Sequence, residues 1–473
     1  MKVVLIRSNE REMARYNMRE TNVAGAFPPL GLAHLAAFIR GAGHDVSILD
    51  AHVENIPVSE LLKFLPTDSP VFGFTSTSKL WPVVAESIRA VKKAFPGKLV
   101  VVGGPQITAY PGESMQSAPA DIGVIGEGEE ALAEIISRYN SNEDYSYVPQ
   151  TVVMKNNKEV INPPFPRSLD LDQLPAPALD LLPLEKYRCV TAQKPFITMV
   201  TTRGCPYRCA FCSQSYFREK VRMESAETVV SRIEDYYLRY RVKEIVIFDD
   251  VFTLNRSRVM KICDLIEGAG IKLKLDIRAR VDNVDGELLK RLSAAGCHRI
   301  HFGIESGTQR ILDLMQKDIT IAQITEAVKA AKAAGMEVRG YFILGYPGET
   351  IEEIEATLAF SRRLPLDWAS FTLATPNPRT KLLQDALQTG LLEFDFYREY
   401  TLGRATGPPP FFPPTGRSLR ALKRLKNRGY IRFYLQRRVI RHVLPWLFQS
   451  QTRHSIREGL LAGFREIGAF NRS

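Results

Sequence analysis

Three cysteines are crowded into eight residues, with three residues between Cys205 and Cys209 and two between Cys209 and Cys212. They follow an apolar, β-branched stretch, FITMV (196–200), which is typical of a strand. Three thiolates can hold a four-iron cubane and leave one iron open to a further ligand. Structural zinc is the alternative, but tetrahedral zinc needs a fourth Cys or His, and none follows within thirty residues. The cysteines therefore indicate a [4Fe-4S] cluster.

This spacing, with Phe211 directly before the third cysteine, resembles the signature of the radical S-adenosylmethionine (SAM) superfamily. The resemblance implies that SAM chelates the open iron and receives an electron that cleaves it to a 5′-deoxyadenosyl radical. It also implies that the Phe211 ring lies against the adenine of SAM. A flavodoxin or ferredoxin is the electron donor that such chemistry implies.

The segments IVIFDDVFT (245–253) and LDIRARVD (275–282) resemble two further motifs of this superfamily. The resemblance implies that Asp249 and Asp250 lie at the amino group of SAM, and that Arg280 approaches its carboxylate. The alternatives are a solvated strand end for the aspartates and a surface salt bridge for the arginine.

Two more motifs, HFGIESGTQRIL (301–312) and GYFILGYPGET (340–350), also resemble the superfamily. The resemblance implies that Glu305 contacts the ribose of SAM. A carboxylate at the end of a buried strand is costly without partners, which favours a functional role for this residue. Gly345, Pro347 and Gly348 are expected to let the backbone approach the adenine closely.

The first 140 residues alternate short apolar runs with helix-like stretches, which predicts a doubly wound parallel sheet. Ligands bind such sheets at the carboxyl ends of their strands. The residues expected there are small or polar, or begin the next helix: Thr75, Ser76, Thr77, Gly103, Gly104, Pro105, Gly126, Glu127 and Gly128.

This part of the chain has no cysteine before Cys189, which excludes the three-cysteine cluster domain of the methylthiotransferases. It resembles instead the cobalamin-binding domain of the cobalamin-dependent radical SAM enzymes, on FPPLGLAHLAAFIRGAGHDVSILDA, VVVGGPQIT and DIGVIGEGEEAL. His52 lacks the surroundings of a cobalt-ligating histidine. It is predicted to be a surface loop residue, with cobalamin bound base-off.

The whole chain is thus expected to be an α/β protein with four segments. They are a Rossmann-like cobalamin domain (1–140), a linker (141–190), a partial (β/α)6 radical SAM barrel (191–403) and a basic helical extension (404–473). Six strands are expected in the barrel, near 196–202, 244–249, 272–277, 299–304, 338–344 and 369–374.

The formal charge of +11 belongs to the C-terminal extension, where twelve Lys and Arg lie between Arg417 and Arg457 without one Asp or Glu. Its basic, amphipathic pattern could contact anionic lipid, nucleic acid or an acidic substrate, or could simply pack on the barrel. No dedicated nucleic-acid module is visible. Without an export signal or an apolar run of about 20 residues, a cytoplasmic protein is expected, with peripheral membrane contact through this extension.

The resemblance implies a methyltransferase acting on an unactivated carbon of a small, hydrophobic substrate, through a 5′-deoxyadenosyl radical and methylcobalamin. A radical cyclase or ring-rearranging enzyme is a second hypothesis, because the chain also resembles the anaerobic magnesium-protoporphyrin IX monomethyl ester cyclases. A third is a non-catalytic cobalamin or nucleic-acid sensor, which the intact cysteine motif argues against.

Overall fold

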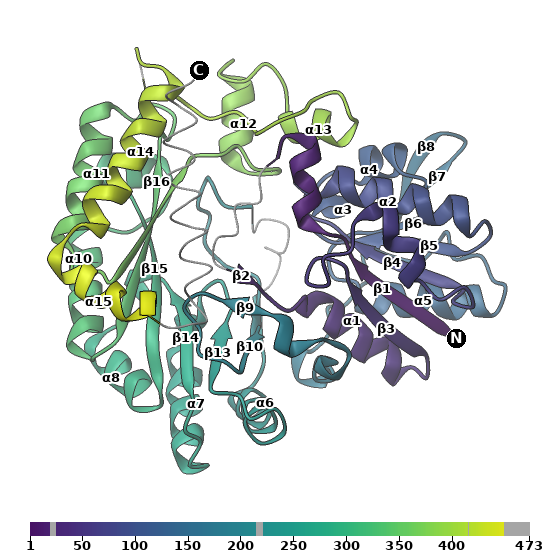
Figure 1. Cartoon of the computed structure of the whole chain (residues 1–473), viewed down its shortest axis with the longest axis horizontal. Helices are drawn as coiled ribbons and strands as arrows, with labels where there is room; N and C mark the ends of the chain where they lie inside the picture. Colours follow the sequence, from purple (N-terminus) through teal and green to yellow (C-terminus); the bar gives the residue numbers. More distant parts are fainter. Residues whose placement is uncertain (19–24, 214–220, 415, 449–473) are drawn as a thin grey trace.

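The computed structural model describes residues 1–18, 25–213, 221–414 and 416–448, with side chains to 444. Two β/α units lie side by side, the N-terminal one coloured purple to blue and the second teal to green (Figure 1). The predicted α/β class, with a Rossmann-like sheet followed by a six-stranded β/α barrel, is confirmed.

The N-terminal sheet has seven strands in the order β3-β1-β4-β5-β6-β7-β8, and its first five strands are parallel. Their bounds are β1 (Lys2–Arg7), β3 (Asp45–Asp50), β4 (Val71–Thr75), β5 (Leu99–Gly103), β6 (Ile122–Val124), β7 (Thr151–Lys155) and β8 (Lys158–Ile161). The helices of this unit are η1 (Glu10–Tyr16), α1 (Leu30–Gly41), η2 (Val58–Phe64), α2 (Trp81–Ala94), α3 (Pro105–Ala109), α4 (Pro111–Ser117) and α5 (Glu129–Asn140). The central strands are continuous apolar runs because helices cover both faces of the sheet.

The hairpin of β7 and β8 corrects the expectation that 141–190 is only a linker. Its two-residue turn is Asn156-Asn157, with φ of 51° and 58°. Asparagine adopts this left-handed conformation at little cost, and such turns match the twist of a hairpin. The signal was therefore present in the sequence.

The second unit is a sheet of six parallel strands in chain order, β10-β13-β14-β15-β16-β17. Its strands are β10 (Phe196–Met199), β13 (Glu244–Ile247), β14 (Lys274–Ala279), β15 (Cys297–Glu305), β16 (Glu337–Leu344) and β17 (Trp368–Leu373). The helices are α6 (Ala226–Arg239), η7 (Phe252–Leu254), α7 (Arg256–Gly268), η8 (Val281–Asn283), α8 (Gly286–Ala294), α9 (Gln309–Leu314), α10 (Ile321–Ala333) and α11 (Ile351–Arg363). The sheet curves into a partial barrel whose outer face these helices cover (Figure 1).

Short strand pairs and 3₁₀ helices accompany the two sheets. Strand β2 (Gly25–Ala26) pairs with β9 (Arg188–Cys189), and β11 (Thr202–Arg203) pairs with β12 (Arg222–Met223). The 3₁₀ helices η3 (Leu171–Gln173), η4 (Leu179–Leu181) and η5 (Leu184–Lys186) lie in the connecting segment.

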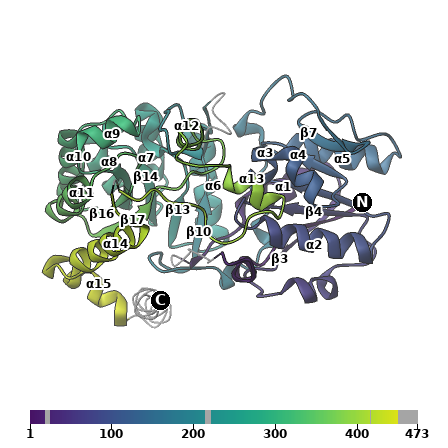
Figure 2. The same cartoon turned by 90° about the horizontal axis from the view of Figure 1, so that it is seen from above.

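After β17 the chain returns to the N-terminal unit. Helix α12 (Lys381–Gln388) is followed by α13 (Phe396–Thr401), which packs against the first unit (Figure 2). The Tyr110 hydroxyl donates to Asp395, and Gln106 donates to Thr401 over 2.8 Å. This segment, predicted to belong to the barrel, therefore also ties the two units together.

The basic extension begins with α14 (Leu419–Tyr434) and α15 (Arg437–Phe448), and residues 449–473 lie outside the described residues. Helix α14 covers the edge strand β17: the Tyr434 hydroxyl donates to the carbonyl of Ala369, and the Tyr430 hydroxyl accepts from the N–H of Phe371. Helix α14 of the extension thus packs on the barrel, and lipid contact stays a prediction. Among the described helices, none is long and apolar enough to cross a membrane.

Candidate active site

The cysteine loop follows β10 and β11, at the carboxyl end of the barrel. Cys209 is buried, Cys205 and Cys212 are half-buried, and none is in a disulfide. The fully buried Asp249 holds the strand end before the loop, because its carboxylate accepts from the backbone N–H of Thr201 at 2.6 Å and of Thr202 at 3.1 Å. Asp249 thus fixes where the cysteine loop begins.

Arg280, directly after β14, connects the cysteine loop to the loop that follows α9. Its Nη1 lies 3.7 Å from Cys209 Sγ, and its Nη2 donates to the carbonyl of Lys317 at 2.7 Å. The guanidinium stacks over the Tyr207 ring at 3.6 Å and pairs with Asp282 at 2.9 Å. A cation held in this way stabilises a thiolate, which is the form that binds iron.

Asp250 lies half-buried beside Asp249, and its contact with SAM stays a prediction. Burial and the neighbouring Asp249 raise the pKa of its carboxyl to about 6.

Glu305 and Lys317 form a buried ion pair of 3.1 Å. Glu305 has a left-handed φ of 64°, at an irregularity in the pairing of β15 with β16. This conformation is strained for a residue other than glycine, and strain of this kind is concentrated at functional sites. The Lys317 ammonium lies 5.8 Å from the centre of the Phe211 ring, which packs against a small apolar cluster that includes Tyr346. Sequence reasoning missed Lys317, because nothing in its neighbourhood indicates that it folds back to Glu305.

The loop after β16 holds Gly345, Pro347 and Gly348. Gly345 has a φ of 72°, and a Cβ there would lie 2.5 Å from Leu422, so glycine is required. Glu349, which sequence reasoning also missed, accepts from the N–H of Gly345 at 2.6 Å and of Tyr346 at 3.1 Å. Its carboxylate therefore organises the loop.

The residues predicted to bind cobalamin gather at the carboxyl edge of the N-terminal sheet. Thr75 ends β4 and is followed by Ser76 and Thr77; Gly103, Gly104 and Pro105 end β5 and begin α3; Gly126, Glu127 and Gly128 precede α5. Ser76 donates its N–H to the carbonyl of Gly103 at 3.1 Å, so two of these segments are in contact. At Gly104 a Cβ would lie 2.7 Å from the hydroxyl of Thr75. Ser76 is buried, and the other eight residues are partly or fully exposed, so this edge is open to a ligand.

His52 corrects one expectation. It follows β3 in a turn, but it is buried rather than at the surface, and its N–H bonds to Asp50 at 3.1 Å. Burial lowers the pKa of its imidazole. The Asp50 carboxylate and the linker residue Tyr187, whose hydroxyl donates to it at 2.9 Å, help to enclose this turn.

Glu127 connects the carboxyl edge of the N-terminal sheet to the carboxyl end of the barrel. Its carboxylate is 2.8 Å from Arg203, which lies two residues before Cys205, and it also pairs with Arg222. The second Nη of Arg203 is 2.6 Å from Glu129. The predicted cobalamin loop and the cysteine loop are therefore neighbours.

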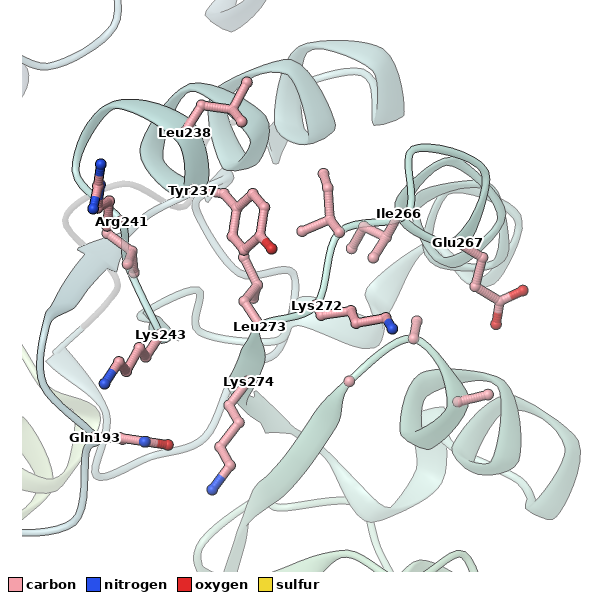
Figure 3. Close-up of a pocket in the computed structure, with 15 residues that line it drawn as sticks. Gln193, Tyr237, Leu238, Arg241, Lys243, Ile266, Glu267, Lys272, Leu273 and Lys274 are labelled. Atoms are coloured by element: carbon pink, nitrogen blue, oxygen red, sulfur yellow. The ribbon is translucent and has the colours of Figure 1, made fainter.

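A solvent-open pocket of about 750 Å³ lies at the opposite end of the barrel, where β13 and β14 begin (Figure 3). Arg241, Lys243, Lys272 and Lys274 surround it, with Tyr237 and Leu238 on α6. Because radical chemistry belongs to the cysteine end, this pocket lies outside the candidate active site.

Comparison with known proteins agrees with this geometry. The chain matches the family model of the radical SAM superfamily over residues 199–361 and that of the B12 binding domain over residues 19–136. A protein of Pyrococcus horikoshii, named as an uncharacterised methyltransferase, is 35% identical over 416 residues, which are 87% of this chain and 89% of that protein. The chain belongs to the cobalamin-dependent radical SAM enzymes.

Two further relatives are informative. The anaerobic magnesium-protoporphyrin IX monomethyl ester cyclase of Cereibacter sphaeroides is 27% identical over 94% of this chain and 72% of its own length. The solved radical SAM methyltransferase TsrM from Kitasatospora setae, with cobalamin and a [4Fe-4S] cluster bound, superposes with a TM-score of 0.66 at 17% identity, over 82% of this chain and 75% of that one. The likeness to TsrM shows the fold.

The cofactors of this radical SAM enzyme are a [4Fe-4S] cluster, SAM and cobalamin. Among the described side chains no three metal ligands already converge on one point, so the fit to a cluster rests on donor chemistry: three thiols on one short loop, one of them beside a guanidinium. The fit to cobalamin rests on the open edge of small residues described above.

Proposed function

We propose that this enzyme is a methyltransferase that methylates an unactivated carbon of a small molecule. The observation that carries the proposal is the Glu127–Arg203 ion pair, which places the predicted cobalamin loop beside the cysteine loop. A reaction that uses both cofactors on one substrate needs them close together and fixed. When bound, the cluster and SAM supply a radical that removes hydrogen, and cobalamin carries the methyl group.

The chain's own residues hold these groups in place. Cys205, Cys209 and Cys212 bind the cluster, and Arg280 stabilises the thiolate of Cys209. We also assign Glu305 to the ribose of SAM, with its carboxylate held in place by the ion pair with Lys317.

On the adenine side, Phe211 and the Gly345–Gly348 loop form the apolar wall, and Glu349 holds the loop in shape. An electron donor of the flavodoxin or ferredoxin class would reduce the cluster.

The experiment begins with anaerobic reconstitution with iron, sulfide and hydroxocobalamin. We expect about four irons per chain, since a cubane holds four, together with one cobalt, and dithionite-driven formation of 5′-deoxyadenosine that is lost in Cys209→Ala. Cys263→Ala, on the outer helix α7, is the matched control. Iron without cobalt would contradict the cobalamin assignment, and zinc instead of iron would remove the radical chemistry.

Methyl transfer is then tested with SAM that carries a labelled methyl group. Label in a product other than methionine and methylcobalamin, which carry the methyl group without any transfer to substrate, supports the proposal. The match to the cyclase over 94% of the chain makes cyclisation the second candidate, and a cyclase would give product without label.

A further inference from the structure

The inner face of the barrel carries charged side chains that the proposed cofactor sites do not use. Arg278 on β14 is the register partner of His301 on β15, which is the partner of Arg339 on β16. Register partners on neighbouring strands point to the same side of a sheet, as do residues two apart on one strand. Arg280, two residues after Arg278, contacts Cys209, so this side faces the cysteine loop. We call Arg278, His301 and Arg339 the inner ring.

The residues that alternate with the inner ring along β14 and β15 point to the outer face of the sheet. Ile277 and Ile300 are fully buried in the core that the outer helices cover. In contrast, Arg278 and Arg339 are only half-buried. Their half-burial means that solvent reaches the two arginines of the inner ring, whereas His301 is buried. Since a strand rises about 3.3 Å per residue, Arg278 lies roughly 7 Å along β14 from Arg280.

His301 is held rigidly in the ring. Its Nδ1 is 2.8 Å from the Tyr341 hydroxyl, and its Nε2 is 2.8 Å from the carboxylate of Asp276, which is also 3.0 Å from Arg299. Burial lowers the pKa of His301 to about 4, so the imidazole is neutral at physiological pH. Its remaining proton faces Asp276, and Tyr341 therefore donates to Nδ1. The Tyr341 oxygen keeps lone pairs for a further donor.

Both arginines rest on aromatic rings. The guanidinium of Arg278 lies 3.9 Å from the ring centre of Phe248, and that of Arg339 lies 5.4 Å from the ring of Trp368. Asp250 interacts with Arg278, but Arg339 has no ion pair with any residue in the described part of the chain. A guanidinium placed over a ring keeps N–H groups at its edge for a planar anion. Arg278 uses its Nη1 to donate to the carbonyl of Ile247 at 2.8 Å, so its other nitrogens are the ones that can meet a ligand.

We propose that the inner ring binds a carboxylate or phosphate group of the substrate. Arg278 and Arg339 donate to the anion, and the Tyr341 oxygen accepts an N–H or O–H next to it. The apolar part of the substrate then extends from the aromatic rings toward the cysteine loop, where the reacting carbon lies. The inference rests on the proposed function only for this last placement.

The test is anaerobic titration calorimetry of the reconstituted holoenzyme with benzoate, phenyl phosphate and the neutral benzamide. Both anions carry a flat ring that suits Phe248 and Trp368, and their comparison separates a carboxylate from a phosphate site. We expect at least one anion to bind, benzamide not to bind, and Arg339→Gln and Arg278→Gln each to weaken binding at least tenfold. Arg339→Lys, which keeps the charge but loses the planar fork, should fall between.

Lys274→Gln is the matched control, because it removes one positive charge from the same strand as Arg278, at the pocket end (Figure 3). It should leave anion binding unchanged. Melting temperature and iron and cobalt content show that each variant is folded. Binding of neither anion, equal binding of benzamide, or binding unaffected by both arginine variants would overturn the proposal.

Methyl transfer is measured separately. Anion binding without labelled product would contradict the proposed methyl transfer and leave the anion site standing. Labelled product without anion binding would support methyl transfer and contradict the anion site.

Discussion

Arg203 bridges two acidic residues of the N-terminal unit, with Nη1 2.8 Å from Glu127 and Nη2 2.6 Å from Glu129. This bridge crosses from the cysteine loop to the loop after β6. Because all three side chains are largely buried, the bridge is less screened by solvent than a surface pair. It therefore couples the cysteine loop to the predicted cobalamin loop.

Glu127→Gln should weaken this coupling. It keeps the side-chain shape but leaves Arg203 and Arg222 short of one negative charge, and we expect a loss of about 1–3 kcal/mol in the free energy of unfolding. Less cobalamin should remain bound after gel filtration. Glu134→Gln, which breaks the exposed pair with Arg138, is the control and should cost at most about 0.5 kcal/mol. Equal effects of the two variants would show that the bridge has no special role.

Arg280→Gln should impair the cluster. The variant loses the cation beside Cys209 and the donor to Lys317, and changes at residues that orient metal ligands typically cost about 10–100-fold. Iron content and the rate of 5′-deoxyadenosine formation measure the effect. Arg291→Gln, at a surface ion pair on α8, provides the comparison. Wild-type iron content and cleavage rate in Arg280→Gln would contradict this role.

Gly345→Ala should be far more damaging than Gly348→Ala. Both glycines have a left-handed φ, of 72° and 78°, so both alanine variants bear the same backbone strain. Only at Gly345 would the new Cβ meet neighbours, with Leu422 at 2.5 Å and the carbonyl of Phe412 at 2.9 Å. We expect Gly345→Ala to cost about 1–3 kcal/mol more, measured by denaturant unfolding. SAM affinity should fall in parallel.

Glu349 should make the stability of the protein depend on pH. Burial raises the pKa of its carboxyl from the ordinary 4.5 to about 7, despite the two backbone N–H donors. The folded state then binds more protons than the unfolded state between these values, so the free energy of unfolding decreases as pH rises from 4.5 through 7.

Glu349→Gln removes this titration and should make the melting temperature of the cluster-free protein less dependent on pH. At about 1.4 kcal/mol per pH unit, the wild type should lose on the order of 3 kcal/mol relative to the variant across that window. Parallel melting curves for the two proteins from pH 4.5 to 8 would show that the carboxyl titrates normally.

The α/β class and the cysteine loop could be predicted from the sequence because they depend on local patterns. The alternation of apolar runs with amphipathic stretches predicted all six barrel strands. The spacing of Cys205, Cys209 and Cys212 indicated a cluster. The β7–β8 hairpin was missed although Asn156-Asn157 marks its turn. In that case the signal was local but was read as part of a linker.

Contacts between residues far apart in the chain were decided only by the tertiary structure. A period of two residues predicts that Arg278 on β14 and Arg280, directly after it, point to the same side. It does not show that His301 and Arg339 stand beside Arg278, because register is set by packing of the opposite face. The same holds for Arg203 and Glu127, which are 76 residues apart. His52 was predicted to be exposed, and Asp50 and Tyr187 help to enclose it. The sequence by itself determined which chemistry the chain can support, and the fold decided which side chains surround it.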